Sequence, residues 1–215
     1  MTREIATEKN GVVRLSYHLG EKLLGTKNAN YSYGSLQRIL KYGLKKIDLS
    51  TVKNILLLGL GGGSVIETLR EDFGYIRKIT AIETDEMIIE IAQDEFSLES
   101  DKNLEIIHDD AIDFVEHTEK KFDLIIIDIF IDTLVPESIY AIDFWKHVYS
   151  ATRSEGTILW NASMSSQREN LSLIKLIPEL EKYFHIEVHE RVRGTNTLLI
   201  GKKLGVILNI LNNSA

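Results

Sequence analysis

Five short apolar runs, separated by helix-like patterns, constrain the fold of this chain more than any other feature. The runs are Ile55–Leu58, Ile79–Ile82, Leu104–Ile107, Leu124–Ile127 and Thr157–Trp160. They lack apolar–polar alternation, which is typical of parallel strands buried on both faces. The helices expected between them are Ser64–Glu71, Asp85–Phe96, Ala111–His117 and Glu137–Thr152. This order predicts an α/β fold with a doubly wound, mostly parallel sheet.

The two ends of the chain carry a different pattern. After a predicted helix at Gln167–Tyr183, the extended runs 185–192 and 197–203 flank a short turn, which is typical of an antiparallel hairpin. Residues 12–19 and 21–25 form a similar pair, and a helical pattern follows at 36–44. We therefore predict a short N-terminal β-hairpin and helix appendage (1–50), a nucleoside-cofactor-binding domain (51–203) and a tail (204–215).

Composition narrows the class of protein. The chain has 215 residues, of which 44% are hydrophobic, and this is enough for one sizeable core. Cysteine is absent, which excludes disulfides and thiolate chemistry. The net charge of −7 is unfavourable for binding nucleic acid. Because no apolar run approaches the roughly 18 residues of a membrane span, and the N-terminus is polar, we expect a cytoplasmic protein.

A glycine-rich turn follows the first apolar run. Gly59, Gly61 and Gly63 stand between Leu58 and a helix-like pattern. Glycine lets the backbone approach a ligand where any Cβ would collide, and the start of the next helix supplies free N–H groups. Strand, glycine turn and helix together predict a nucleotide-binding loop. A tight turn without a ligand is the structural alternative.

Three acidic residues at strand ends extend this prediction. Glu83 lies about 20 residues past the loop, where a carboxylate can accept hydrogen bonds from both hydroxyls of a ribose. Asp110, followed by Ala111, lies where it can accept from the amine of an adenine, although a helix N-cap is an equal interpretation. Asp128 ends the fourth run, at the ligand-binding edge of such sheets, and can orient or deprotonate a nucleophile. The structural alternatives are a solvated charge at Glu83 and a cap at Asp128.

A nicotinamide cofactor would also fit the loop and Glu83. However, Ser64 stands where a G-x-G-x-x-G loop has its third glycine, and the Asp110-Ala111 pair favours a different nucleoside cofactor. The six histidines form no spaced metal set, so we expect no metal.

The glycine loop, Glu83, Asp110-Ala111 and Asp128, in this order, resemble the class I S-adenosylmethionine-dependent transferases. From about residue 10 to about residue 160 the chain is similar to the spermidine synthase (polyamine aminopropyltransferase) family. The segments AIETDEMIIE, DDAIDFV and IIIDIFIDTLVPESIYAIDFW are the most specific part of this similarity. The resemblance implies a Rossmann-like, mostly parallel seven-stranded sheet with a C-terminal antiparallel hairpin and a short N-terminal β appendage.

The resemblance also implies roles for individual residues. It implies that Asp128 orients or deprotonates the acceptor and that Tyr33 closes the pocket, so these two are the candidate catalytic residues. The residues implied to hold the cofactor are Gly59, Gly61, Gly63, Glu83, Asp110 and Ala111.

Three departures from the family pattern affect the polyamine side. The loop aspartate that helps aminopropyltransferases hold the amine of decarboxylated S-adenosylmethionine falls on Gly62. The aspartate that anchors the diamine falls on Ile131, one residue before Asp132. An acidic pair is replaced by Ala29 and Asn30. The nucleoside half of the pattern is therefore kept and the polyamine half is largely lost.

These observations favour an S-adenosylmethionine-dependent methyltransferase that acts on a small molecule. An aminopropyltransferase using decarboxylated S-adenosylmethionine is the second interpretation, and a nucleoside-binding protein without turnover is the third. Amines are candidate acceptors and a homodimer is a candidate assembly. We expect neither nucleic acid nor a membrane as partner.

Overall fold

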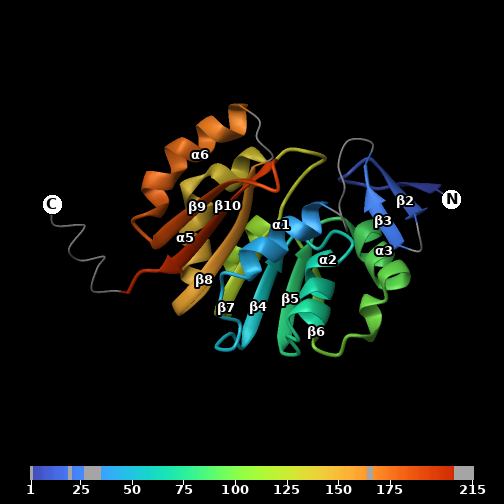
Figure 1. Cartoon of the computed structure of the whole chain (residues 1–215), viewed down its shortest axis with the longest axis horizontal. Helices are drawn as coiled ribbons and strands as arrows, with labels where there is room; N and C mark the ends of the chain where they lie inside the picture. The colour runs from blue at the N-terminus through green and yellow to red at the C-terminus, as the bar shows by residue number, and fades with distance from the viewer. Residues whose placement is uncertain (1, 19–20, 27–34, 164–166, 206–215) are drawn as a thin grey trace.

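A computed structural model describes residues 2–18, 21–26, 35–163 and 167–205, which form two sheets (Figure 1). The larger sheet has seven strands in the order β6-β5-β4-β7-β8-β10-β9. Its strands are β4 (Asn54–Leu58), β5 (Lys78–Glu83), β6 (Leu104–His108), β7 (Phe122–Ile127), β8 (Thr152–Ser163), β9 (Phe184–Val192) and β10 (Asn196–Lys203). The strands from β6 to β8 are parallel, and β10 runs antiparallel to β8 and β9. The predicted mostly parallel sheet with a C-terminal antiparallel hairpin is confirmed.

The central strand β4 explains the unbroken apolar runs in the sequence. Ile55 and Leu57 pack into the core on one face of the sheet, and Leu56 and Leu58 pack into the core on the other. All four side chains are fully buried. Because both faces are covered, every position of the strand favours an apolar residue.

Helices cover both faces of the large sheet. The α-helices are α1 (Ser35–Leu44), α2 (Ser64–Glu67), α3 (Glu86–Phe96), α4 (Ala111–His117), α5 (Ile142–Ala151) and α6 (Gln167–Leu180). Side chains of α1, α2 and α3 belong to one core cluster and those of α4, α5 and α6 to the other. Figure 1 shows α1 and α2 in front of the sheet.

Two predicted helices differ in detail. The helix expected at Ser64–Glu71 is α-helical for one turn and continues as a π-helix over Thr68–Asp72. The helix expected at Glu137–Thr152 is divided at Ala141, whose extended backbone separates a 3₁₀-helix (Glu137–Tyr140) from α5. A further 3₁₀-helix, Leu98–Ser100, follows α3.

The second sheet is N-terminal and antiparallel, with β2 (Val12–His18) between β1 (Thr2–Ala6) and β3 (Glu21–Gly25). The β2–β3 pair was expected, whereas β1 is short, mostly exposed and gives no apolar pattern. Val13 and Leu24 pack against Ile88 and Ile91 of α3, which places this sheet beside α3 (Figure 1).

Helix α1 packs on the large sheet although its sequence precedes the predicted cofactor domain. Ile39, Leu40 and Leu44 are buried in the same core cluster as β4. A Cβ at Gly43 would lie 2.5 Å from the side chain of Leu159 on β8, so helix and strand are in close contact. The division of the chain at residues 50 and 203 stays a prediction. Across the described ranges, no helix combines the length and the apolar character that a membrane span requires.

Candidate active site

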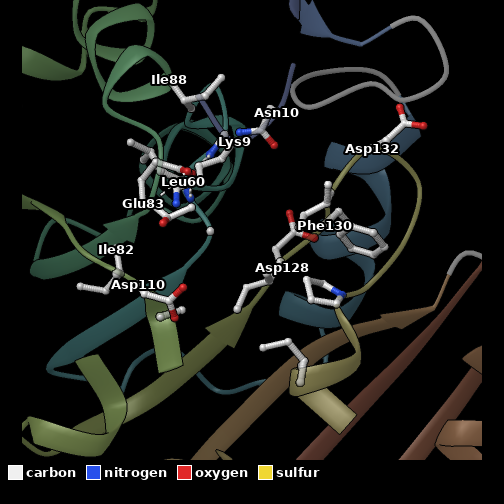
Figure 2. A pocket seen from close by; sticks show the side chains of 18 of the residues that line it. Lys9, Asn10, Leu60, Ile82, Glu83, Ile88, Asp110, Asp128, Phe130 and Asp132 are labelled. Atoms are coloured by element: carbon white, nitrogen blue, oxygen red, sulfur yellow. Dashed lines mark hydrogen bonds between the residues drawn. The ribbon is translucent and has the colours of Figure 1, made fainter. Parts of the chain in front are cut away.

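A cavity of about 390 Å³ opens at the carboxyl ends of β4, β5, β6 and β7 (Figure 2). Glu83 ends β5, the residues Gly59, Asp109 and Asp128 directly follow β4, β6 and β7, and all four line the cavity. Parallel strands bring their carboxyl ends to one edge of the sheet, which is why residues far apart in sequence meet here. The N-terminal sheet and the β9–β10 turn contribute further lining residues.

The glycines of the loop have different structural reasons. Gly59 has φ +93°, and a Cβ there would lie 2.3 Å from the backbone oxygen of Asp128. Gly63 has φ +81° and begins α2, where a Cβ would lie 2.4 Å from the side chain of Leu98. Gly59 and Gly61 line the cavity, whereas Gly63 is not among its described lining residues. Packing within the protein therefore accounts for Gly59 and Gly63.

The Glu83 carboxylate lies beneath the glycine loop. Its Oε2 accepts hydrogen bonds from the backbone N–H groups of Leu60 (3.2 Å) and Gly61 (3.3 Å). Its Oε1 accepts from the N–H groups of Thr84 (3.0 Å) and Asp85 (3.1 Å). Burial raises the pKa of Glu83 above its usual value, and these four donors oppose that rise by stabilising the charge. Glu83 therefore shapes the loop as well as facing the cavity.

Asp85 connects the N-terminal sheet to the cavity, and no sequence pattern singles this residue out. Its Oδ2 accepts hydrogen bonds from the backbone N–H groups of Lys9 (3.0 Å) and Asn10 (3.3 Å) and from the Asn10 side chain (3.0 Å). Burial would raise the pKa of Asp85, but these donors and Thr7 outweigh it and lower the pKa below the usual value. The turn between β1 and β2 is thereby held over the cavity, where Lys9 and Asn10 line it.

Asp110 and Ala111 lie at the start of α4 and line the cavity. Asp110 Oδ1 accepts a hydrogen bond from the N–H of Ile112 at 2.8 Å, so the N-cap interpretation holds for this oxygen. Asp110 is exposed, and Figure 2 shows its carboxylate at the cavity below Glu83. Capping and ligand binding are therefore compatible for this residue.

Asp128 is half-buried and lies near the centre of the cavity (Figure 2). Its Oδ1 accepts a hydrogen bond from Asn161 Nδ2 at 2.9 Å. Burial raises the pKa of Asp128 from 3.8 to about 6, and the hydrogen bond from Asn161 opposes this rise. A carboxylate with such a pKa is ionised at neutral pH and can still accept a proton from a bound molecule.

The loop after β7 forms the side of the cavity opposite Glu83 (Figure 2). Phe130, Ile131 and Asp132 line it, and Asp132 has a left-handed backbone with φ +55°. The hydroxyl of Thr26 donates a hydrogen bond to Asp132. Tyr33, the second candidate catalytic residue, lies outside the described residues.

Lys9 gives the cavity its positive charge. It is the one lysine or arginine among the described lining residues, whereas Glu83, Asp109, Asp110, Asp128 and Asp132 are acidic. Figure 2 shows Lys9 on the same side as Leu60 and Glu83. No sequence pattern marks Lys9, because the β1–β2 turn reaches the cavity only through tertiary contacts.

Comparison with known sequences gives one family. Residues 38–199 match the family model of the spermine/spermidine synthase domain. A polyamine aminopropyltransferase of Clostridium beijerinckii is 32% identical over 124 residues, which cover 55% of this chain and 43% of that protein. An eEF1A lysine and N-terminal methyltransferase homolog of Drosophila melanogaster is 30% identical over 118 residues, which cover 51% of this chain and 17% of that protein. The chain thus matches less than half the length of these two relatives.

Comparison with solved structures gives the same fold. A probable spermidine synthase from Corynebacterium glutamicum has a TM-score of 0.75 at 17% identity and covers 94% of this chain and 80% of its own. Human methyltransferase-like protein 13, in complex with SAH, has a TM-score of 0.62 at 20% identity. The match covers 83% of this chain and 86% of that chain. At these identities the likeness shows a Rossmann-like fold that spermidine synthases and methyltransferases share.

Proposed function

The chain belongs to the spermine/spermidine synthase domain family, and on that premise we propose that it transfers the methyl group of S-adenosylmethionine to a small molecule. The observation that carries the choice of methyl transfer is the charge pattern of the cavity. Lys9 supplies a cation that attracts the carboxylate of intact S-adenosylmethionine, and Gly62 puts no acidic side chain in the glycine loop. Decarboxylated S-adenosylmethionine lacks that carboxylate, so it gains nothing from Lys9.

The nucleoside is held at the ends of β5 and β6 in this proposal. The ribose hydroxyls donate hydrogen bonds to Glu83, whose carboxylate is fixed in place by backbone donors. The adenine lies against Ala111, and its amine donates to Asp110 Oδ2, since Oδ1 is used by the N-cap. Gly59 and Gly61 lie along the methionine part.

The reaction in this proposal is a displacement at a carbon bonded to a sulfonium. A lone pair of the acceptor forms a bond to the methyl carbon, the carbon–sulfur bond breaks, and its electron pair returns to sulfur. The acceptor's proton passes to Asp128, which burial has made a stronger base than an exposed aspartate. The enzyme otherwise contributes alignment and a negative environment for the cation.

Aminopropyl transfer is the second candidate, and one observation favours it. Asp132 lines the cavity together with Asp128, although the family's diamine-anchoring position is occupied by Ile131. Two carboxylates on one loop could hold two ammonium groups of a diamine. A nucleoside-binding protein without turnover is the third candidate.

Calorimetry with both forms of the cofactor tests the proposal. We expect S-adenosylmethionine to bind more tightly than the decarboxylated form. Lys9→Met should reduce that preference about three- to fivefold, as expected for a partly solvated ion pair. Gly62→Asp should reduce the preference for S-adenosylmethionine further, by about tenfold, because the new carboxylate repels the carboxylate of the cofactor. A wild-type preference for the decarboxylated form, with rapid conversion of putrescine, would instead establish the aminopropyltransferase.

A further inference from the structure

A chain of hydrogen-bonded side chains ends on Asp128. Asn161 Nδ2 donates to Asp128 Oδ1 at 2.9 Å, and Asn196 Nδ2 donates to Asn161 Oδ1 at 2.9 Å. The hydroxyl of Thr195 donates to Asn196 Oδ1 at 2.7 Å. We call Thr195, Asn196 and Asn161 the amide relay. It starts in the turn between β9 and β10, crosses to β8 and reaches the loop after β7.

Every hydrogen bond of the amide relay points the same way. Each side chain accepts through its oxygen and donates toward Asp128, and the last group is an amide N–H, which has no lone pair to accept a proton. Within the described ranges, this N–H is the recorded hydrogen-bond partner of the Asp128 carboxylate. Asp128 Oδ1 therefore accepts the hydrogen bond from Asn161, and Asp128 Oδ2 is the oxygen that can take up a proton.

The relay lies where the sheet would otherwise be apolar. Asn161 and Asn196 are 0% and 1% exposed, and Trp160 and Ala162 on either side of Asn161 are also buried. The register of β10 shifts between Asn196 and Leu198, and such a bulge re-aims a side chain. Buried amides cost stability unless they are hydrogen-bonded, so apolar residues would serve packing alone equally well.

We propose that Asn161 and Asn196 are positioning residues that hold the Asp128 carboxylate with Oδ2 toward the acceptor. This inference rests on the proposed function, because it assigns Oδ2 the proton that the acceptor loses. As the acceptor bonds to the methyl carbon and the electron pair of the carbon–sulfur bond returns to sulfur, that proton moves to Oδ2. The β9–β10 turn thereby sets the orientation of the base.

The pKa of Asp128 depends on the hydrogen bond that the amide relay donates to it. Burial raises the pKa of Asp128 to about 6, and the Asn161 donor holds it from rising further. The other charged side chains lining the cavity are Lys9 of the β1–β2 turn, Glu83 of β5, Asp109 and Asp110 after β6, and Asp132 after β7. Substitutions in the relay leave all of these in place.

Carboxyl NMR titration of Asp128 in the ligand-free protein is the first test. Asn161→Leu removes the donor at similar volume, so the pKa of Asp128 should rise by about one unit. Thr197→Val removes a buried hydroxyl of β10, next to Asn196 but outside the relay, and should leave the pKa of Asp128 unchanged. An unchanged pKa in folded Asn161→Leu would overturn the proposal.

Asn196→Leu provides a second variant should Asn161→Leu fold poorly. Leucine at position 196 removes the donor to Asn161 Oδ1 and adds no charge, so the amide of Asn161 is no longer held with its N–H toward Asp128. The pKa of Asp128 should rise again, although the changed residue does not touch it. No shift in this variant would contradict the direction of the relay.

Activity and binding separate the relay from the proposed function. In both variants the lower limb of the pH profile of kcat should move to higher pH together with the pKa of Asp128. The affinity of Asn161→Leu for S-adenosylmethionine should stay within about twofold, because Asn161 is not among the described residues that line the cavity. A fall in affinity with an unmoved pH profile would overturn the positioning role. If the wild-type protein binds no S-adenosylmethionine, the proposed function itself fails.

Discussion

Glu83 combines a structural and a ligand-facing position in a single side chain. Both of its oxygens accept backbone N–H groups, two from the glycine loop and two from the residues after β5. Hydrogen bonds to a charged acceptor are strong, and unsatisfied buried N–H groups are costly. The carboxylate therefore holds the glycine loop in its shape at the edge of the cavity.

We predict that Glu83→Gln weakens both the loop and the site. The new amide group faces two N–H donors instead of accepting from them, so the unfolding temperature should fall. The affinity for S-adenosylmethionine should fall about tenfold or more, from the loss of roughly 1.5–3 kcal/mol. Glu105→Gln is the matched control, since that carboxylate forms ion pairs with Lys78 and Lys120 at the surface. Equal melting curves and affinities for the two variants would contradict the role of Glu83.

Single residues differ in how far the sequence predicts them. Glu83, Asp110 and Asp128 follow apolar runs, so their place at one edge of the sheet follows from the strand pattern. Lys9 and Asn196 reach the cavity through a docked turn and a β-bulge, and neither leaves a local pattern. Asn161 had one signal, because it is a polar residue at the end of a buried run. The catalytic and binding roles themselves stay predictions.

The N-terminal sheet is an element held in place by α3 and by the residue just before it. Glu95 of α3 forms ion pairs with Arg3 and Lys22 and accepts a hydrogen bond from Tyr17. Asp85 accepts hydrogen bonds from Lys9 and Asn10 of the β1–β2 turn. The sequence predicted β2 and β3 from their apolar content, but β1 depends on pairing with β2 and docking on α3.

We predict that Asp85→Ala releases the β1–β2 turn without unfolding the large sheet. Residues 7–11 should lose protection from hydrogen exchange, since the N–H groups of Lys9 and Asn10 no longer hydrogen-bond to Asp85 and the turn is released. S-adenosylmethionine should bind several-fold more weakly because Lys9 is no longer held over the cavity. Asp48→Ala is a suitable control. Asp48 accepts hydrogen bonds from Ser50 in an exposed turn and is not among the described residues that line the cavity. Protection of residues 7–11 equal to wild type would refute this account.

At the scale of the whole molecule, the buried charge of Asp128 lowers the free energy of unfolding. Its pKa is about 6 in the folded protein against 3.8 ordinarily, so the folded state holds the proton more tightly than the unfolded chain. The stabilising contribution of the protonated form is complete below about pH 4 and is lost as the pH rises through about 6. The difference is on the order of 3 kcal/mol.

We predict that Asp128→Asn is more stable than wild type at pH 8 and equal to it near pH 4. The variant has no charge to bury, and its side-chain oxygen can still accept from Asn161. Urea unfolding of both proteins at pH 4, 6 and 8 measures the difference. A stability difference independent of pH would show that the buried charge is not its cause. Turnover should be lost in the same variant if Asp128 accepts the proton.

The contact between Gly59 and the backbone of Asp128 has a consequence for how such a site diverges. A side chain at position 59 would displace the main chain of Asp128, so it would disturb the glycine loop and the candidate catalytic aspartate in one step. The cavity-lining residues Phe130, Ile131, Asp132 and Pro136 follow that contact on a loop. Substitutions in that loop can therefore reshape the cavity while the contact between the ends of β4 and β7 stays fixed.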